Sequence, residues 1–72
     1  MIVLHVESKT VGRMTRSNRH EVEFSPVDTF ALVQFGEWRF SDDYVVYPRH
    51  ELRHFLTRDA ALKVLKELLQ PC

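Results

Sequence analysis

The sequence predicts an α+β fold in which a small antiparallel sheet of three to five strands packs against a C-terminal amphipathic helix. Short apolar or alternating segments, separated by proline, glycine and short polar residues, recur through the first two thirds of the chain, a pattern typical of antiparallel strands. The last stretch instead repeats its apolar residues with helical spacing. A chain of 72 residues has the size of a single small domain, residues 1–72.

The N-terminal third predicts two strands separated by a loop. Ile2 to Glu7 alternates an apolar set with a less apolar one, which predicts a first strand with His5 on its polar side. Ser8 to Asn18 has few apolar side chains, so we expect a long loop or a frayed hairpin tip. Glu21 to Phe24 alternates again and stops at Ser25-Pro26, which predicts a second strand because proline has no backbone donor for a sheet interior.

The middle of the chain predicts a hairpin and a further strand. Phe30 to Phe35 is almost continuously apolar and β-rich, as in a central strand, and Gly36 permits a turn into Trp38–Phe40. Ser41–Asp43 is turn chemistry, since short polar side chains bond their own backbone. Tyr44 to Tyr47 then returns to strand composition.

The segment from Pro48 to Leu56 fits two patterns. Leu52, Phe55 and Leu56 form a helical stripe, with Pro48 near the first turn, whereas Leu52, His54 and Leu56 would line one face of a strand. Of the two, a helix is slightly favoured.

The C-terminal helix has the clearest pattern in the sequence. Thr57 is placed to cap the first amides, Asp59 suits the positive end, and Ala60 to Gln70 are mostly strong helix formers before Pro71 ends the helix. Its apolar side chains form one wide stripe, which would pack on a sheet face or a partner.

Composition restricts the environment of the protein. No apolar run approaches the roughly 20 residues of a membrane helix, and no signal-peptide pattern opens the chain, so we expect a cytoplasmic protein that does not bind membranes. The only cysteine is Cys72, expected to be a passive thiol, which excludes an internal disulfide and a thiolate zinc cluster.

Basic side chains gather in one stretch, although the formal net charge is zero. We expect this basic loop, residues 8–19, to be flexible. It contains Lys9, Arg13, Arg16 and Arg19 with no acid between them. Such a loop would neutralise phosphates, so nucleic-acid binding, with help from Arg49 and Arg53, is an alternative function. The stretch has no aromatic residue and an acidic block follows it, which favours a solvated loop.

The aromatic residues are expected mainly in the core, because a small domain needs large side chains to fill its centre. The alternative is a partly exposed hot spot at Trp38, rimmed by Glu37, Asp42 and Asp43, which is the composition that protein interfaces favour.

The five residues His50-Glu51-Leu52-Arg53-His54 match the H-E-x-x-H motif, and in this they resemble zinc metalloproteases. That chemistry requires a helix, which puts both imidazoles on one face to hold Zn²⁺. No histidine follows His54, so a third ligand would have to be Asp59, Glu67 or an upstream residue. We therefore expect a coincidental match and no cofactor; the alternative is a zinc site or metallohydrolase with His50 and His54 as ligands. Serine, histidine and acidic residues occur without a motif that assembles a nucleophilic triad.

The function expected from these features is that of a small non-enzymatic binding module. It would dock on a larger protein assembly and regulate or inhibit it, as small regulators of phages and other mobile elements often do. Such a function needs surface patches and no preorganised pocket. The residues expected to contact the partner are Arg13, Arg16, Arg19, Trp38, Asp42, Asp43, Arg49 and Arg53.

Overall fold

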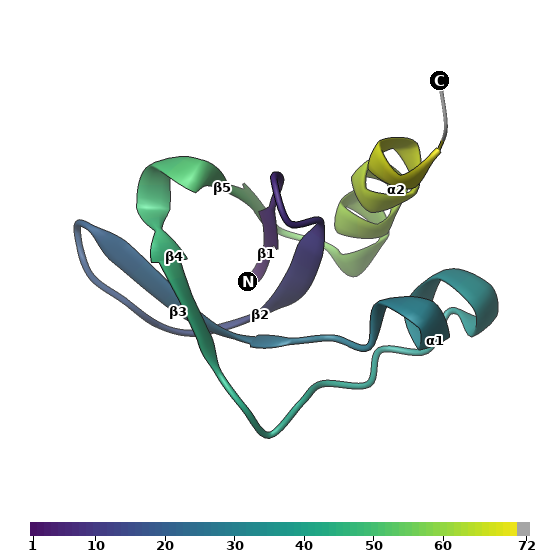
Figure 1. Cartoon of the computed structure of the whole chain (residues 1–72), viewed down its shortest axis with the longest axis horizontal. Helices are drawn as coiled ribbons and strands as arrows, with labels where there is room; N and C mark the ends of the chain where they lie inside the picture. The colour runs from purple at the N-terminus through teal and green to yellow at the C-terminus, as the bar shows by residue number, and fades with distance from the viewer. Residues whose placement is uncertain (71–72) are drawn as a thin grey trace.

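The strands of the protein form one antiparallel sheet, and its two α-helices pack outside it, which confirms the α+β class (Figure 1). The computed structural model describes residues 1–70. The expected helix stop at Pro71 and the terminal thiol of Cys72 lie outside the described residues. In chain order the elements are β1 (Ile2–His5), β2 (Thr10–Ser17), β3 (Glu21–Pro26), α1 (Thr29–Phe35), β4 (Val45–Pro48), the 3₁₀ helix η1 (Arg49–Glu51), β5 (Leu52–Phe55) and α2 (Arg58–Leu69).

The sheet curls upon itself. Its strand order is β4-β3-β2-β1-β5, so the two edge strands, β4 and β5, are consecutive in the sequence. Only the three residues of η1 join them, and a link this short requires the two edges to approach each other. Figure 1 shows the five strands arranged around an open ring, with α1 and α2 on one side.

Curling gives the sheet two separate cores. An inner core lies between strands on the concave face and contains Val3, Val22, Phe24 and Leu52. An outer core lies between the sheet and the helices and contains Ile2, Leu4, Val11, Val27, Leu32, Ala61 and Leu65. Alternate residues of β1 enter one core or the other, as the period of a strand requires. His5, expected on a polar side, is therefore only 3% exposed, because β1 has no solvent face.

The loop predicted over Ser8 to Asn18 is wrong, since most of it is strand β2. β2 pairs with β1 on one side and β3 on the other, and Val11 is fully buried between them. Gly12 explains why so polar a segment forms a central strand. A Cβ at this position would overlap the Phe24 ring and the Ser25 carbonyl oxygen, so glycine permits the close approach of β2 to β3.

The central strand predicted at Phe30 to Phe35 is also wrong, because these residues form α1. Asp28 caps the helix, its Oδ1 accepting a hydrogen bond from the Ala31 amide at 3.1 Å. Gly36 ends it in the left-handed conformation, with φ of 70°. The expected hairpin with Trp38–Phe40 does not form either; Phe40 makes only an isolated bridge with Val27.

The slightly favoured helix over Pro48 to Leu56 is replaced by η1 followed by strand β5. Leu52–Phe55 pairs along the whole of β1, so the strand alternative was the better description of these residues. The predicted strands at Glu21 to Phe24 and Tyr44 to Tyr47 are confirmed as β3 and β4, within one or two residues at their ends.

The C-terminal helix is confirmed as α2. Thr57 Oγ1 accepts a hydrogen bond from the Ala60 amide at 3.2 Å, as its capping role predicts. Ala61 and Leu65 enter the outer core from its buried face. Among residues 1–70, no helix is long and apolar enough to cross a membrane.

Candidate functional site

Two phenylalanines of α1 form the most exposed aromatic surface near the helices. Phe30 and Phe35 are 67% and 66% exposed, whereas Ala31 and Leu32 of the same helix are buried. Their rings meet edge to face, with centroids 5.9 Å apart. We call these two residues the aromatic pair. Apolar side chains that occur singly on a surface are common, whereas contiguous exposed apolar patches are found at interaction sites when they are large.

A second cluster combines arginine and aromatic side chains. The Arg13 guanidinium lies 4.6 Å from the Phe40 ring centroid, and that of Arg58 lies 5.5 Å from both the Phe40 and Trp38 centroids. Trp38 and Phe40 stack on each other and are half-buried against the outer core. This arginine–aromatic cluster, formed by Arg13, Trp38, Phe40 and Arg58, joins β2, the segment after α1 and the first turn of α2.

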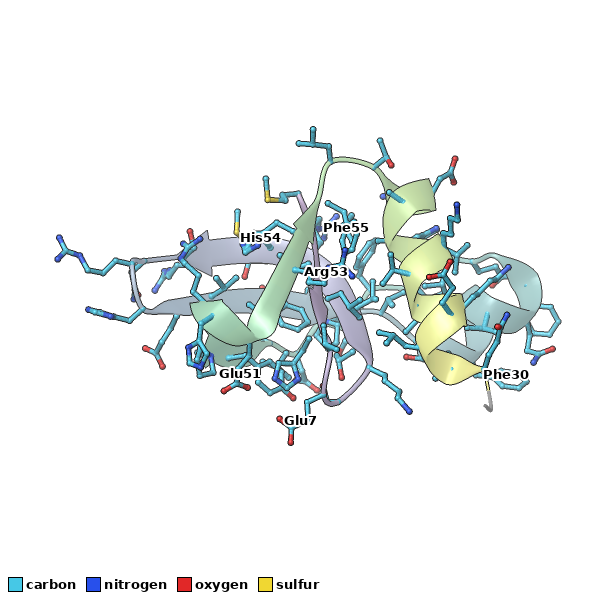
Figure 2. The ribbon with its side chains drawn as sticks, turned by 90° about the horizontal axis from the view of Figure 1, so that it is seen from above. Glu7, Phe30, Glu51, Arg53, His54 and Phe55 are labelled. Atoms are coloured by element: carbon cyan, nitrogen blue, oxygen red, sulfur yellow. The ribbon has the colours of Figure 1, made fainter. Side chains whose placement is uncertain are left out.

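Of the eight residues predicted to contact a partner, the structure brings Arg13 and Trp38 into this one cluster. Arg53 lies on β5, with its guanidinium 5.4 Å from the Phe55 ring centroid (Figure 2). Arg49 is engaged within the protein, since its Nε and Nη2 donate to the Asn18 carbonyl oxygen at 3.0 and 2.7 Å. Asp42 and Asp43 lie exposed in the bend before β4.

Arg16 and Arg19 lie toward the β2–β3 turn, where acidic residues accompany them. Arg16 lines a shallow cavity of about 130 Å³ together with Glu21 and Glu23. Carboxylates beside the guanidinium oppose phosphate binding at this position. The structure therefore separates the basic residues of the predicted loop rather than concentrating them.

The H-E-x-x-H residues do not form the helix that a zincin site needs. His50 lies in η1 and His54 in β5, because the backbone changes from 3₁₀ helix to strand at Leu52. The two imidazoles therefore do not share a helical face. Glu51 instead turns toward His5, more than forty residues away in the sequence.

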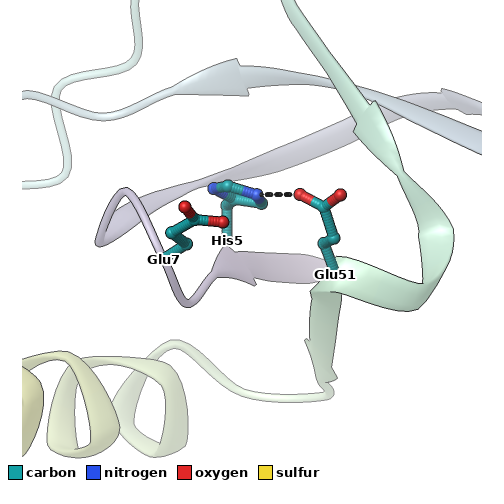
Figure 3. A group of neighbouring side chains, drawn as sticks. All are labelled: His5, Glu7 and Glu51. Atoms are coloured by element: carbon teal, nitrogen blue, oxygen red, sulfur yellow. Dashed lines mark hydrogen bonds and ion pairs between the residues drawn. The ribbon is translucent and has the colours of Figure 1, made fainter.

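His5, Glu7 and Glu51 form a cluster that the sequence did not reveal (Figure 3). His5 Nε2 lies 2.7 Å from Glu51 Oε1, and its Nδ1 lies 2.6 Å from Ser8 Oγ. One ligand atom from each of His5, Glu7 and Glu51 lies within 4.8 Å of the others, so within residues 1–70 this group has the spacing of a cation site. The β1–β5 register, which pairs His5 with Leu52, brings the cluster together. No local motif signals such a pairing.

The aromatic pair and the His5 cluster are distinct sites. Figures 1 and 2 place α1, which carries Phe30, at the opposite end of the molecule from η1 and Glu51. The sequence pattern had assigned Phe30 and Phe35 to a buried strand. The capping residues Asp28 and Gly36 were the signal that would have indicated a helix with an exposed side.

No family model matches this chain, and no curated protein or solved structure matches it. Function is therefore inferred from these surfaces and their chemistry.

Proposed function

We propose that this protein is a small non-enzymatic binding module that docks on a larger protein assembly through the aromatic pair of α1 and regulates or inhibits that assembly. The observation that carries the proposal is the exposure of Phe30 and Phe35, two touching rings on a helix that Leu32 anchors in the outer core. Rigid, exposed aromatic side chains supply most of the binding free energy at many protein interfaces.

The arginine–aromatic cluster supplies further contact area to the docking surface in this proposal; its Trp38 follows Phe35 by three residues in the sequence. A stable interface buries about 800 Å² on each partner, more than two phenylalanines provide. Neither Arg13 nor Arg58 forms an ion pair with another described residue. A partner segment that carries acidic side chains around an apolar centre fits this combination.

A protein partner is favoured over nucleic acid because the basic residues outside the arginine–aromatic cluster are dispersed. Glu21 and Glu23 accompany Arg16, and Arg49 is held by Asn18. The most exposed aromatic rings, those of Phe30 and Phe35, lie on a helix that carries no basic residue. Stacking of bases normally requires cations beside the rings.

The test is affinity capture from the native cell lysate, treated with nuclease, by the wild-type chain and by a double variant, Phe30→Gln with Phe35→Gln. We expect the variant to recover at least tenfold less of the assembly, since loss of a hot-spot residue costs about 2 kcal/mol or more. Leu56→Gln is the matched control, because Leu56 is 89% exposed and lies outside the pair. It should capture as well as the wild type.

Circular dichroism should show that both variants keep the wild-type fold, since all three side chains are largely exposed. Equal capture by the double variant would refute docking through α1. Recovery only of material that nuclease removes would instead support the nucleic-acid alternative.

A further inference from the structure

The His5 ring is fixed on three sides. It is buried and stacks on Tyr47, with ring centroids 3.6 Å apart and an interplanar angle of 13°. Both ring nitrogens have polar partners, Ser8 at Nδ1 and Glu51 at Nε2. A ring held in this way presents one defined nitrogen to each partner.

The hydrogen bonds assign the tautomer. The Ser8 backbone amide donates to His5 Nδ1 at 3.3 Å, so Nδ1 carries a lone pair and the proton resides on Nε2. Nε2 then donates to Glu51 Oε1 at 2.7 Å. With Nδ1 an acceptor, the Ser8 hydroxyl at 2.6 Å donates to it. Thr10 Oγ1 lies 2.8 Å from Ser8 Oγ and donates to the Ser8 carbonyl oxygen at 3.5 Å.

This sequence of bonds is the signature of an activated nucleophile: a hydroxyl bonded to a base that a carboxylate orients. We propose that Ser8 is a reactive nucleophile, with His5 as its general base and Glu51 as the residue that positions and stabilises the imidazole. Its substrate class is small activated esters. This inference goes beyond the docking function and does not depend on it.

In the reaction, the Ser8 Oγ–H proton moves to His5 Nδ1 while Oγ forms a bond to the ester carbonyl carbon. The tetrahedral intermediate expels the alcohol oxygen, which takes the proton from Nδ1. The products are an acyl-serine and a free alcohol, and His5 returns to its neutral form. The negative charge of Glu51 stabilises the transient imidazolium. Ser8 is exposed in the turn after β1, so a small ester reaches it.

The same geometry favours a nucleophile over a cation site at His5, Glu7 and Glu51. A cation bound at Nε2 would have to displace the proton that bridges His5 to Glu51. Glu7 is exposed and Figure 3 draws no bond from it to His5 or Glu51, whereas the Glu51–His5 bond is already formed.

The experiment is to expose the full chain to p-nitrophenyl acetate and follow acetylation of each serine by peptide mass spectrometry. Ser17 is the internal control, since it is also exposed and has no histidine hydrogen-bonded to its hydroxyl among the described residues. We expect Ser8 to be acetylated about 100-fold faster than Ser17, as general-base assistance provides. Hydroxylamine should remove the Ser8 label, which distinguishes an ester from acetylated amines. Equal rates at the two serines would overturn the proposal.

Glu51→Gln keeps the size of the side chain and removes its charge, so it tests the positioning role. We expect acetylation of Ser8 to slow about tenfold or more with the fold unchanged. Nitrogen NMR of the wild-type imidazole should show the proton on Nε2; a proton on Nδ1 would contradict the assigned roles. If Zn²⁺ alone binds stoichiometrically and Ser8 is unreactive without it, the cluster is a cation site and the proposal is wrong.

Discussion

Replacing Phe24 with alanine is expected to lower the free energy of unfolding by about 3–5 kcal/mol. The Phe24 side chain is fully buried and is the largest such side chain in the chain's described part. It occupies the inner core, where its ring centroid lies 5.9 Å from that of Tyr47. A domain of this size has a total stability of roughly 4–11 kcal/mol, so the loss is a large fraction of the total.

Urea titration followed by circular dichroism and by the fluorescence of Trp38, the only tryptophan, measures this loss. Tyr44→Ala is the matched control, since Tyr44 is an exposed aromatic residue and its loss should change stability by no more than about 0.5 kcal/mol. Similar urea midpoints for Phe24→Ala and Tyr44→Ala would mean that the curled sheet has no inner core.

Replacing Leu65 with alanine is expected to cost about 2–5 kcal/mol, because its side chain is fully buried in the outer core. Lys66→Ala, on the exposed side of α2, should have little effect. The circular dichroism and Trp38 signals should shift together, since α2 packs on β1 and Arg58 of α2 contacts Trp38. If the circular dichroism signal of the helix is lost at a lower urea concentration while the Trp38 transition is unchanged, α2 is only a peripheral element.

The parts of the fold predicted correctly are those whose signals are local. Alternation in Glu21 to Phe24, the strand composition of Tyr44 to Tyr47, and the cap and apolar stripe of α2 need no knowledge of distant residues. β2 was missed because its polar residues are held by two neighbouring strands and by the close approach at Gly12. β5 was undecided because its partner, β1, lies at the other end of the chain.

α1 shows how local signals compete. The β-rich composition of Phe30 to Phe35 predicted a strand, whereas the Asp28 cap and the left-handed Gly36 select a helix. The same error concealed the exposed aromatic pair, since a helix with only Ala31 and Leu32 buried leaves both phenylalanines in solvent.

The candidate sites were predicted only in part. The grouping of Arg13 with Trp38 depends on Phe40 bridging to Val27, and the His5–Glu51 contact depends on the β1–β5 register. Both are consequences of tertiary structure. The H-E-x-x-H pattern, in contrast, is conspicuous in the sequence. It crosses from η1 into β5, so its two histidines are not brought together by the turns of a helix.

Site-specific photo-crosslinking tests the central claim, docking through α1, most directly. Phe35 is replaced by p-benzoylphenylalanine, the native lysate is irradiated with nuclease present, and covalent adducts are identified by mass spectrometry. The docking account predicts a protein adduct at position 35 and none when the same group replaces Leu56, which is more exposed but lies outside the pair. An adduct at position 56 and none at position 35 would contradict it.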